Sequence, residues 1–205
     1  MKRFRYIFLG VFLGLAAIGA ARPILGQQSG TLVFEVKNYT SDAKLPKKIQ
    51  KVMEHGGIGW GTLDNSVLIS MVRENFVKAD LQYFTRFGEQ KTLEMKAGQY
   101  TITCIGYEFV STWSLDVDKN LAKSAFINSD IVTFTVLPGK TTTLEISPVI
   151  VAKSVWVRLS SVTMFSPDLT VRVLEDGAPK GEDVVITRRT ENSVAWNDYH
   201  GPLKF

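Results

Sequence analysis

The chain has 205 residues, of which 45% are apolar and 21% are charged. That length suits one domain of ordinary size or a domain with a small appendage. The composition excludes a disordered chain and a chain that lies in the membrane along its whole length, so the protein can bury a proper core.

The N-terminus has the layout of a secretory signal peptide. A basic start is followed by an uncharged apolar run over residues 6–21 and then by small residues. The alternative is a retained N-terminal membrane anchor, but a spanning helix needs roughly 20 apolar residues, more than this run contains. We therefore predict a signal peptide over residues 1–26 and an extracytoplasmic protein, periplasmic or secreted. The candidate cleavage positions follow Ala20, Ala21 and Gly26.

The positive charge of the chain belongs to this segment. The formal net charge is +4, and four basic residues without any acidic residue fall in or beside residues 1–26. They are Lys2, Arg3, Arg5 and Arg22. Without them the basic and acidic residues are equal in number, so the charge does not indicate a nucleic-acid partner.

A strand and a helix are the first elements expected after the signal. Residues 31–38 alternate apolar and polar side chains, which predicts a strand. Apolar residues then recur at helical spacing, and Pro46 suits a first helical turn. They are Leu45, Ile49, Val52 and Met53. We therefore predict a short helix near residues 45–55, followed by a glycine-rich loop over residues 58–65.

Residues 66–110 contain successive runs with the pattern of strands. Ala97-Gly98 is expected to be a turn between two short strands. The single cysteine, Cys104, cannot form an internal disulfide, and its apolar neighbours on an alternating run predict a small buried hydrophobe. Residues 111–130 have no clear period and predict a long loop with a helical turn.

Residues 131–151 give the clearest hairpin pattern in the chain. Apolar and polar residues alternate on both sides of Pro138-Gly139, which predicts two strands joined by a tight turn. The letters G-K-T at this turn also end a phosphate-binding loop. That loop requires a glycine where Phe134 stands, and a helix where β-branched residues follow. We therefore expect no nucleotide to bind here.

The last third continues in the same style. Strands are expected over residues 154–165, 168–176 and 183–190, with turns at Ser166-Pro167 and in D-G-A-P-K-G, and an edge strand near the C-terminus. Strands that recur about every 8 to 12 residues between Gly/Pro turns predict an all-β fold, an antiparallel β-sandwich. We divide it into a sandwich domain over residues 30–150 and a β-rich segment over residues 151–205, which either completes the sandwich or forms a small second unit.

One stretch of this last third resembles a known family. "LTVRVLEDGAPKGEDVVITRR" is similar to the opening hairpin of carboxypeptidase-regulatory-like and prealbumin-like bacterial domains, in which D-G-x-P joins two strands. The runs "MKAGQYTITCIGYE" and "VTFTVLPGKTTTLEI" are similar to the way those domains continue. The order differs, because the D-G-x-P hairpin comes last here. The resemblance implies an immunoglobulin-like or prealbumin-like β-sandwich, and it carries no catalytic residue with it.

The residue types of metal and catalytic sites are sparse. His55, His200 and Cys104 do not have the spacing of a zinc site. The run D-V-D-K-N at residues 116–120 begins like a calcium loop but lacks its glycine and its final glutamate. No G-x-S-x-G motif is present. We therefore predict no catalytic residue, no cofactor-binding residue and no metal ligand.

The C-terminal residues "AWNDYHGPLKF" have the composition of a carbohydrate-binding face. Rings of Trp and Tyr stack on sugars, and the amide and carboxylate groups between them bond hydroxyls. The predicted ligand-binding residues are Trp60, Trp113, Trp196 and Tyr199. The alternative, which the sequence favours, is that Trp60 docks onto the core and that the two C-terminal rings hold the chain end to the sandwich.

Together these patterns favour an exported, non-enzymatic β-sandwich protein of a bacterial envelope, acting as a binding or structural module. An envelope protein or a polysaccharide is the expected kind of partner, and neither nucleic acid nor nucleotide is expected. Two alternatives stay open, a carbohydrate-binding module that uses exposed Trp and Tyr, and a small secreted hydrolase with a dispersed carboxylate site. Assembly through an exposed strand edge is a further route to a partner.

Overall fold

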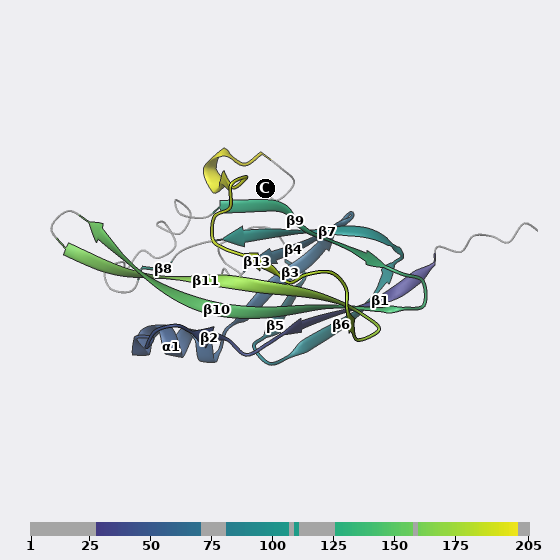
Figure 1. Cartoon of the computed structure of the whole chain (residues 1–205), viewed down its shortest axis with the longest axis horizontal. Coiled ribbons are helices and arrows are strands. Elements are labelled where there is room, and N and C mark those ends of the chain that lie inside the picture. The colour runs from purple at the N-terminus through teal and green to yellow at the C-terminus, as the bar shows by residue number, and fades with distance from the viewer. Residues whose placement is uncertain (1–27, 71–80, 107–108, 111–125, 158–159, 201–205) are drawn as a thin grey trace, which may run out of the picture.

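The structure is a computed structural model in which two β-sheets pack face to face and a short helix lies beside them (Figure 1). It describes residues 28–70, 81–106, 109–110, 126–157 and 160–200. The prediction of an all-β sandwich with one short helix is confirmed. No helix in these described ranges is both long and apolar enough to cross a membrane.

Strands from both halves of the chain form each sheet. The first sheet has the order β12 (Ala178–Pro179), β11 (Ser160–Glu175), β10 (Thr141–Val157), β1 (Ser29–Val36) and β6 (Gln90–Lys96), with β2 (Thr40–Ser41) beside β10 and with β8 (Phe109–Val110) and β13 (Val184–Ile186) beside β11. The second has the order β14 (Val194–Ala195), β9 (Phe126–Val136), β7 (Gly98–Gly106), β4 (Ser66–Ser70), β3 (Gly57–Leu63) and β5 (Tyr83–Arg86). Both sheets are mixed, because β1 and β2 pair with β10 in parallel and β4 pairs with β7 in parallel. The expectation that all strands are antiparallel is therefore wrong at these pairs.

The predicted hairpin over residues 131–146 is wrong. The turn is present, with Gly139 at a φ of +67°, but β9 enters the second sheet and β10 enters the first. The backbone N–H of Gly139 donates to the oxygen of Ser29 at 2.9 Å, and Thr31 N–H donates to Lys140 at 2.9 Å, so the turn joins β1. Both strands bury one apolar face, and crossing between the sheets lets these faces meet across the core.

The turn at Ala97-Gly98 connects the two sheets in the same way. It lies where the sequence predicts it, between β6 of the first sheet and β7 of the second. The hydroxyl of Tyr100 donates to the backbone oxygen of Lys96 at 2.7 Å and so closes the bend. A tight turn in a sandwich can therefore join two strands of one sheet, as a hairpin, or carry the chain from one sheet to the other. The alternation of apolar and polar residues does not distinguish these two connections.

The longest hairpin joins β10 and β11, and it corrects two expectations. The predicted strand over residues 154–165 is divided between these two strands, which pair without a break from Thr142–Glu175 to Val157–Ser160. The predicted turn at Ser166-Pro167 is a continuous part of β11. Pro167 is tolerated because the outer neighbours β8 and β13 leave a gap at that position, so no ladder hydrogen bond is lost there.

The predicted loop over residues 58–65 is also wrong, because residues 57–63 form strand β3. Its glycines occupy alternate positions and therefore share one face. A Cβ on Gly57 would lie 2.3 Å from the backbone oxygen of Thr85, and one on Gly59 would lie 3.1 Å from Leu81. Glycine is needed here because neighbouring chain crosses this face closely, and not because the segment is a loop.

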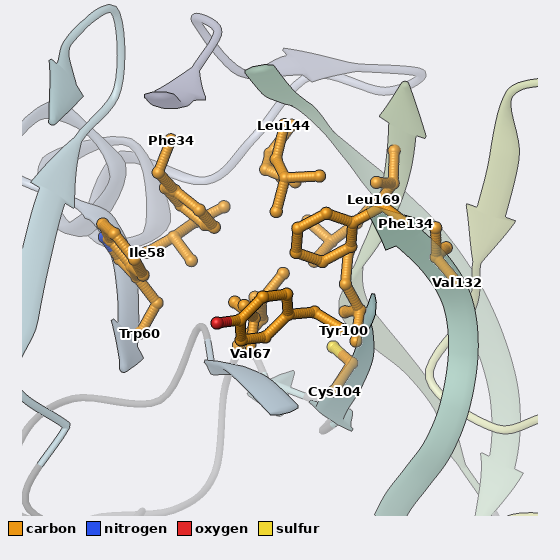
Figure 2. Packing of buried hydrophobic residues seen from close by; sticks show 14 of the residues in the cluster. Phe34, Ile58, Trp60, Val67, Tyr100, Cys104, Val132, Phe134, Leu144 and Leu169 are labelled. Atoms are coloured by element: carbon orange, nitrogen blue, oxygen red, sulfur yellow. The ribbon is translucent and has the colours of Figure 1, made fainter. Parts of the chain in front are cut away.

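The main core lies between the sheets (Figure 2). Its largest buried side chains include Trp60 and Phe34, whose rings stack with centroids 4.1 Å apart at 11°. The sulfur of Cys104 lies in the same cluster, which confirms the expected buried thiol, and burial raises its pKa to about 12. The C-terminal strands contribute Leu169, Val171 and Ile186 to this core.

A second, smaller core lies under the helix α1 (Lys47–Glu54), which confirms the predicted helix. Its members come from residues 45–54 and from the middle of the β10–β11 hairpin. They are Leu45, Ile49, Met53, Ile150 and Phe165. The helix therefore covers a part of the hairpin that the second sheet does not reach.

The D-G-A-P stretch forms the hairpin that its turn letters predict. Asp176 and Gly177 have φ values of 47° and 84°, and Glu175 pairs with Ala178. Positive φ at both central residues is the geometry of a type I′ turn, the turn that matches the twist of adjoining strands.

Candidate functional site

The structure separates the four predicted ligand-binding residues. Trp60 is 0% exposed in the main core, which contradicts the candidate ligand contact and confirms the favoured alternative that this ring docks onto the core. Its indole Nε1–H donates to Thr85 Oγ1 at 2.9 Å, which satisfies its one polar group. Trp113 lies outside the described residues. Trp196 and Tyr199 lie together at the C-terminal end of the described chain.

Trp196 and Tyr199 form a pair of stacked rings. Trp196 begins a short 3₁₀ helix, η1 (Trp196–Asp198), and Tyr199 follows it directly. The ring centroids are 6.5 Å apart and the ring planes differ by 21°. Both side chains are half-buried, whereas the intervening Asn197 and Asp198 are exposed. Along the chain, the nearly parallel rings of Trp196 and Tyr199 thus stand on either side of the Asn197 amide and the Asp198 carboxylate.

Strand β14 places this pair beside Phe126. Ala195 pairs with Phe126 on one side, and Gly106 pairs with it on the other. The guanidinium carbons of Arg188 and Arg189 lie 5.0 Å and 4.9 Å from the centroid of the Phe126 ring. Such contacts are cation–π interactions. We call Phe126, Arg188, Arg189, Trp196 and Tyr199 the C-terminal cluster. Figure 1 shows the C-terminal segment, in yellow, above the first residues of β9, the strand that begins at Phe126.

Buried polar bonds hold the backbone of this cluster. The side chain of Asn128 is 1% exposed, and its amide donates to the backbone oxygens of Arg188 at 3.2 Å and Cys104 at 3.4 Å. Its oxygen accepts bonds from the hydroxyls of Thr190 and Ser193. A buried amide with both ends bonded fixes its partners, so residues 188–193 have one position on β9.

The two arginines form a centre of positive charge. The pKa of Arg188 is lowered from its ordinary value, first by partial burial and then by the charge of Arg189. The Arg188 guanidinium stays ionised at neutral pH in spite of this shift, because arginine titrates far above neutral pH. Two like charges on one ring repel each other, and an anion that bonds both of them relieves that repulsion.

Other charged groups occupy different parts of the molecule. Lys37 bonds Glu35 at 2.6 Å and Glu145 at 3.0 Å on the outer face of the first sheet. The pKa of Asp168 is raised by burial and then by Asp42. Within the described ranges, no group of three or more His, Cys, Asp and Glu side chains is placed to hold a metal ion.

Sequence reasoning found two members of the C-terminal cluster and missed three. Phe126 falls in the stretch that was expected to be a loop, and the arginines were taken as part of a strand. The adjacent pair Arg188-Arg189 is visible in the sequence, but its position on Phe126 depends on pairing between β14 and β9. No family model, curated protein or solved structure matches this chain.

Proposed function

We propose that this protein is an exported, non-enzymatic binding module of a bacterial envelope. The N-terminal pattern over residues 1–26 supports export, and the balanced charge of the remaining chain supports a protein that does not act on nucleic acid. The all-β sandwich supplies a rigid scaffold, on which a binding surface is held by sheet pairing and by buried polar bonds.

The ligand that suits the C-terminal cluster is an acidic polysaccharide, one whose sugars carry carboxylate groups. Two observations carry this proposal: the pair of guanidinium groups on Phe126, and the stacked rings of Trp196 and Tyr199, which follow the residue that pairs with Phe126. An aromatic ring offers a flat face to the apolar side of a sugar. Guanidinium groups bond carboxylates in a bidentate manner, which adds both strength and orientation.

Each part of the cluster has a role in this arrangement. Trp196 and Tyr199 pack against sugar rings, and Arg188 and Arg189 bond the carboxylate of a uronic acid. The exposed Asn197 amide and Asp198 carboxylate exchange hydrogen bonds with sugar hydroxyls, since these groups offer both donors and acceptors. A neutral polysaccharide uses only part of this set, because it offers no carboxylate to Arg188 and Arg189.

The alternative role of the two rings is to hold the chain end to the sandwich. That task is already served by the pairing of β14 with β9 and by the buried bonds of Asn128. Both rings also keep part of their surface in solvent. The stacked pair is therefore available for a ligand without loss of the anchor.

The test is affinity electrophoresis of the exported protein in gels that contain polygalacturonate, a polymer of uronic acid. We expect the polymer to retard the wild-type protein and expect Arg189→Gln to weaken binding about tenfold, because it removes a charge-assisted bond. Trp196→Ala is expected to weaken binding by a similar factor.

Two controls make the result specific. Dextran, a neutral polymer, is expected to leave the protein unretarded. Arg86→Gln changes an exposed arginine on β5 that is not part of the cluster, so it is expected to bind polygalacturonate like the wild type. Equal retardation of the wild type and Arg189→Gln, or none for either, would exclude this ligand.

A further inference from the structure

One face of the β10–β11 hairpin is covered in two successive zones and then left open. Residues at alternate positions of β10 share this face. Leu144 and Ile146 pack in the main core, and Ile150 packs under helix α1. The next large residue in the same alternation is Trp156, which is 76% exposed. The row of side chains that is buried at Leu144, Ile146 and Ile150 therefore continues to Trp156, beyond the second sheet and helix α1 that cover its first part.

The open zone is a two-stranded ribbon that extends past the body of the sandwich. Figure 1 shows the ends of β10 and β11 reaching beyond the second sheet and helix α1. The outer strands β2 and β8 pair only with Val149–Ile150 and Met164–Phe165 respectively, so no described strand pairs alongside the ribbon beyond them. An exposed Trp at the end of a projecting ribbon can reach a flat surface before the sandwich does.

The charges of this ribbon have one sign. Between Glu145 and Asp168 the sequence contains no Asp or Glu, and its charged residues are Lys153 and Arg158. Lys153 is exposed, and Arg158 lies outside the described residues. The register places Ser154, Ser161 and Thr163 around Trp156 on its face, so the indole is surrounded by small neutral polar residues. Beyond Ala152 the described part of the ribbon therefore presents an aromatic ring and the positive charge of Lys153, and neither strand carries a carboxylate there. The Asp42 carboxylate, which accepts the backbone N–H of Ala152 at 3.1 Å, lies at the base of the ribbon.

We propose that this ribbon binds the surface of an anionic phospholipid bilayer, with Trp156 inserted at the level of the head groups. An indole is amphipathic and concentrates at membrane–water interfaces. A lysine near an anionic surface adds attraction, and a nearby carboxylate would oppose it. This contact is separate from the C-terminal cluster and does not depend on a glycan ligand.

A bilayer suits the size of the open zone better than a second copy of the chain does. A stable protein interface needs about 20–30 residues from each partner. Among the described side chains of this zone, the exposed ones are Lys153, Ser154, Trp156 and Ser161, far fewer than such an interface needs. A single ring with one cation is enough for weak, reversible binding to a membrane, where attraction depends on buried apolar area and on lipid charge.

The test is sedimentation of the exported protein with vesicles of phosphatidylcholine, with or without phosphatidylglycerol. We expect binding to the anionic vesicles, and expect Trp156→Ser to reduce the partition coefficient about tenfold through lost apolar burial. Lys153→Glu is expected to reduce it about fivefold, with the loss confined to anionic vesicles. Brominated lipids are expected to quench part of the tryptophan fluorescence of the wild type, and that part is absent in Trp156→Ser.

Matched variants separate the ribbon from the rest of the surface. Phe84→Ser removes an exposed ring on β5, and Lys96→Glu reverses an exposed charge at the far end of β6. Both are expected to bind vesicles like the wild type, and all forms are compared with the same N-terminus. Equal sedimentation of the wild type and Trp156→Ser would overturn the proposal. So would a dimer in analytical ultracentrifugation that Trp156→Ser dissociates, because the open face would then bind a second copy.

Discussion

Trp60 and Trp156 both lie on β-strands, and their surroundings are opposite. Trp60 stands between glycines and is 0% exposed, whereas Trp156 stands between valines and is 76% exposed. The sequence favours docking of Trp60 onto the core, and its burial confirms that prediction. The comparison shows that exposure is decided by what the tertiary structure lays over a face, and not by the bulk of adjacent residues.

The physical reason lies in the elements around each ring. The glycine face of β3 lets neighbouring backbone pack closely against it: a Cβ added at Gly57 would lie 2.3 Å from the backbone oxygen of Thr85. On the opposite face of β3, Trp60 packs in the main core. Trp156 continues the buried row of β10, but the second sheet and helix α1 both end before it. A tryptophan on a β-strand is therefore buried in the core at Trp60 and exposed to solvent at Trp156.

The largest expected difference between the two regions is in the cost of removing each ring. Trp60→Ala is expected to lower the free energy of unfolding by about 3–5 kcal/mol, because it leaves a cavity beside Phe34. Trp156→Ala is expected to change it by about 0.5 kcal/mol or less. Urea denaturation measures both. Similar losses for the two variants would mean that the ribbon is covered in solution.

An intermediate effect is expected from the glycines of β3. Gly57→Ala forces a methyl group against the backbone oxygen of Thr85 and is expected to cost about 1–3 kcal/mol. Gly98→Ala is the control, since the nearest atom to its added Cβ is 4.0 Å away on Tyr100. Thermal unfolding compares the two. An unchanged midpoint for Gly57→Ala would contradict the close approach of β5 to this face.

The smallest expected effect is at Asp168, in the middle of the β10–β11 hairpin between the two regions. Burial and the charge of Asp42 raise the pKa of Asp168, so the folded state keeps this proton to higher pH than the unfolded state. Its contribution to stability therefore falls as pH rises above the ordinary value of the carboxyl group. Asp168→Asn is expected to raise the unfolding midpoint at pH 7 by about 1–3 °C.

The dependence on pH provides the check on this prediction. At a pH below the ordinary value for an aspartate the carboxyl is protonated in both states, and the gain from Asp168→Asn is expected to disappear. Calorimetric scans at pH 7 and pH 3 test this directly. A gain of equal size at both values would point to packing rather than to the charge.

The candidate site was predictable only in part. Trp196 and Tyr199 are recognisable from the sequence because they are close together and flank polar residues. Phe126, Arg188 and Arg189 were not, because the pairing of β14 with β9 and the buried bonds of Asn128 unite segments that are far apart along the chain. The exposure of Trp156 was missed for a related reason, since it depends on where helix α1 and the second sheet end.

By itself the sequence determined the all-β class, the helix near residues 45–55, and the places where the chain turns, at Ala97-Gly98, Gly139 and Asp176-Gly177. These are local properties, set by side-chain period and by the φ values that glycine and aspartate accept. Only the tertiary structure decided which strands pair. A hairpin and a crossing between sheets have the same alternation and the same kind of turn, and burial of both apolar faces against each other selects the crossing at Gly139.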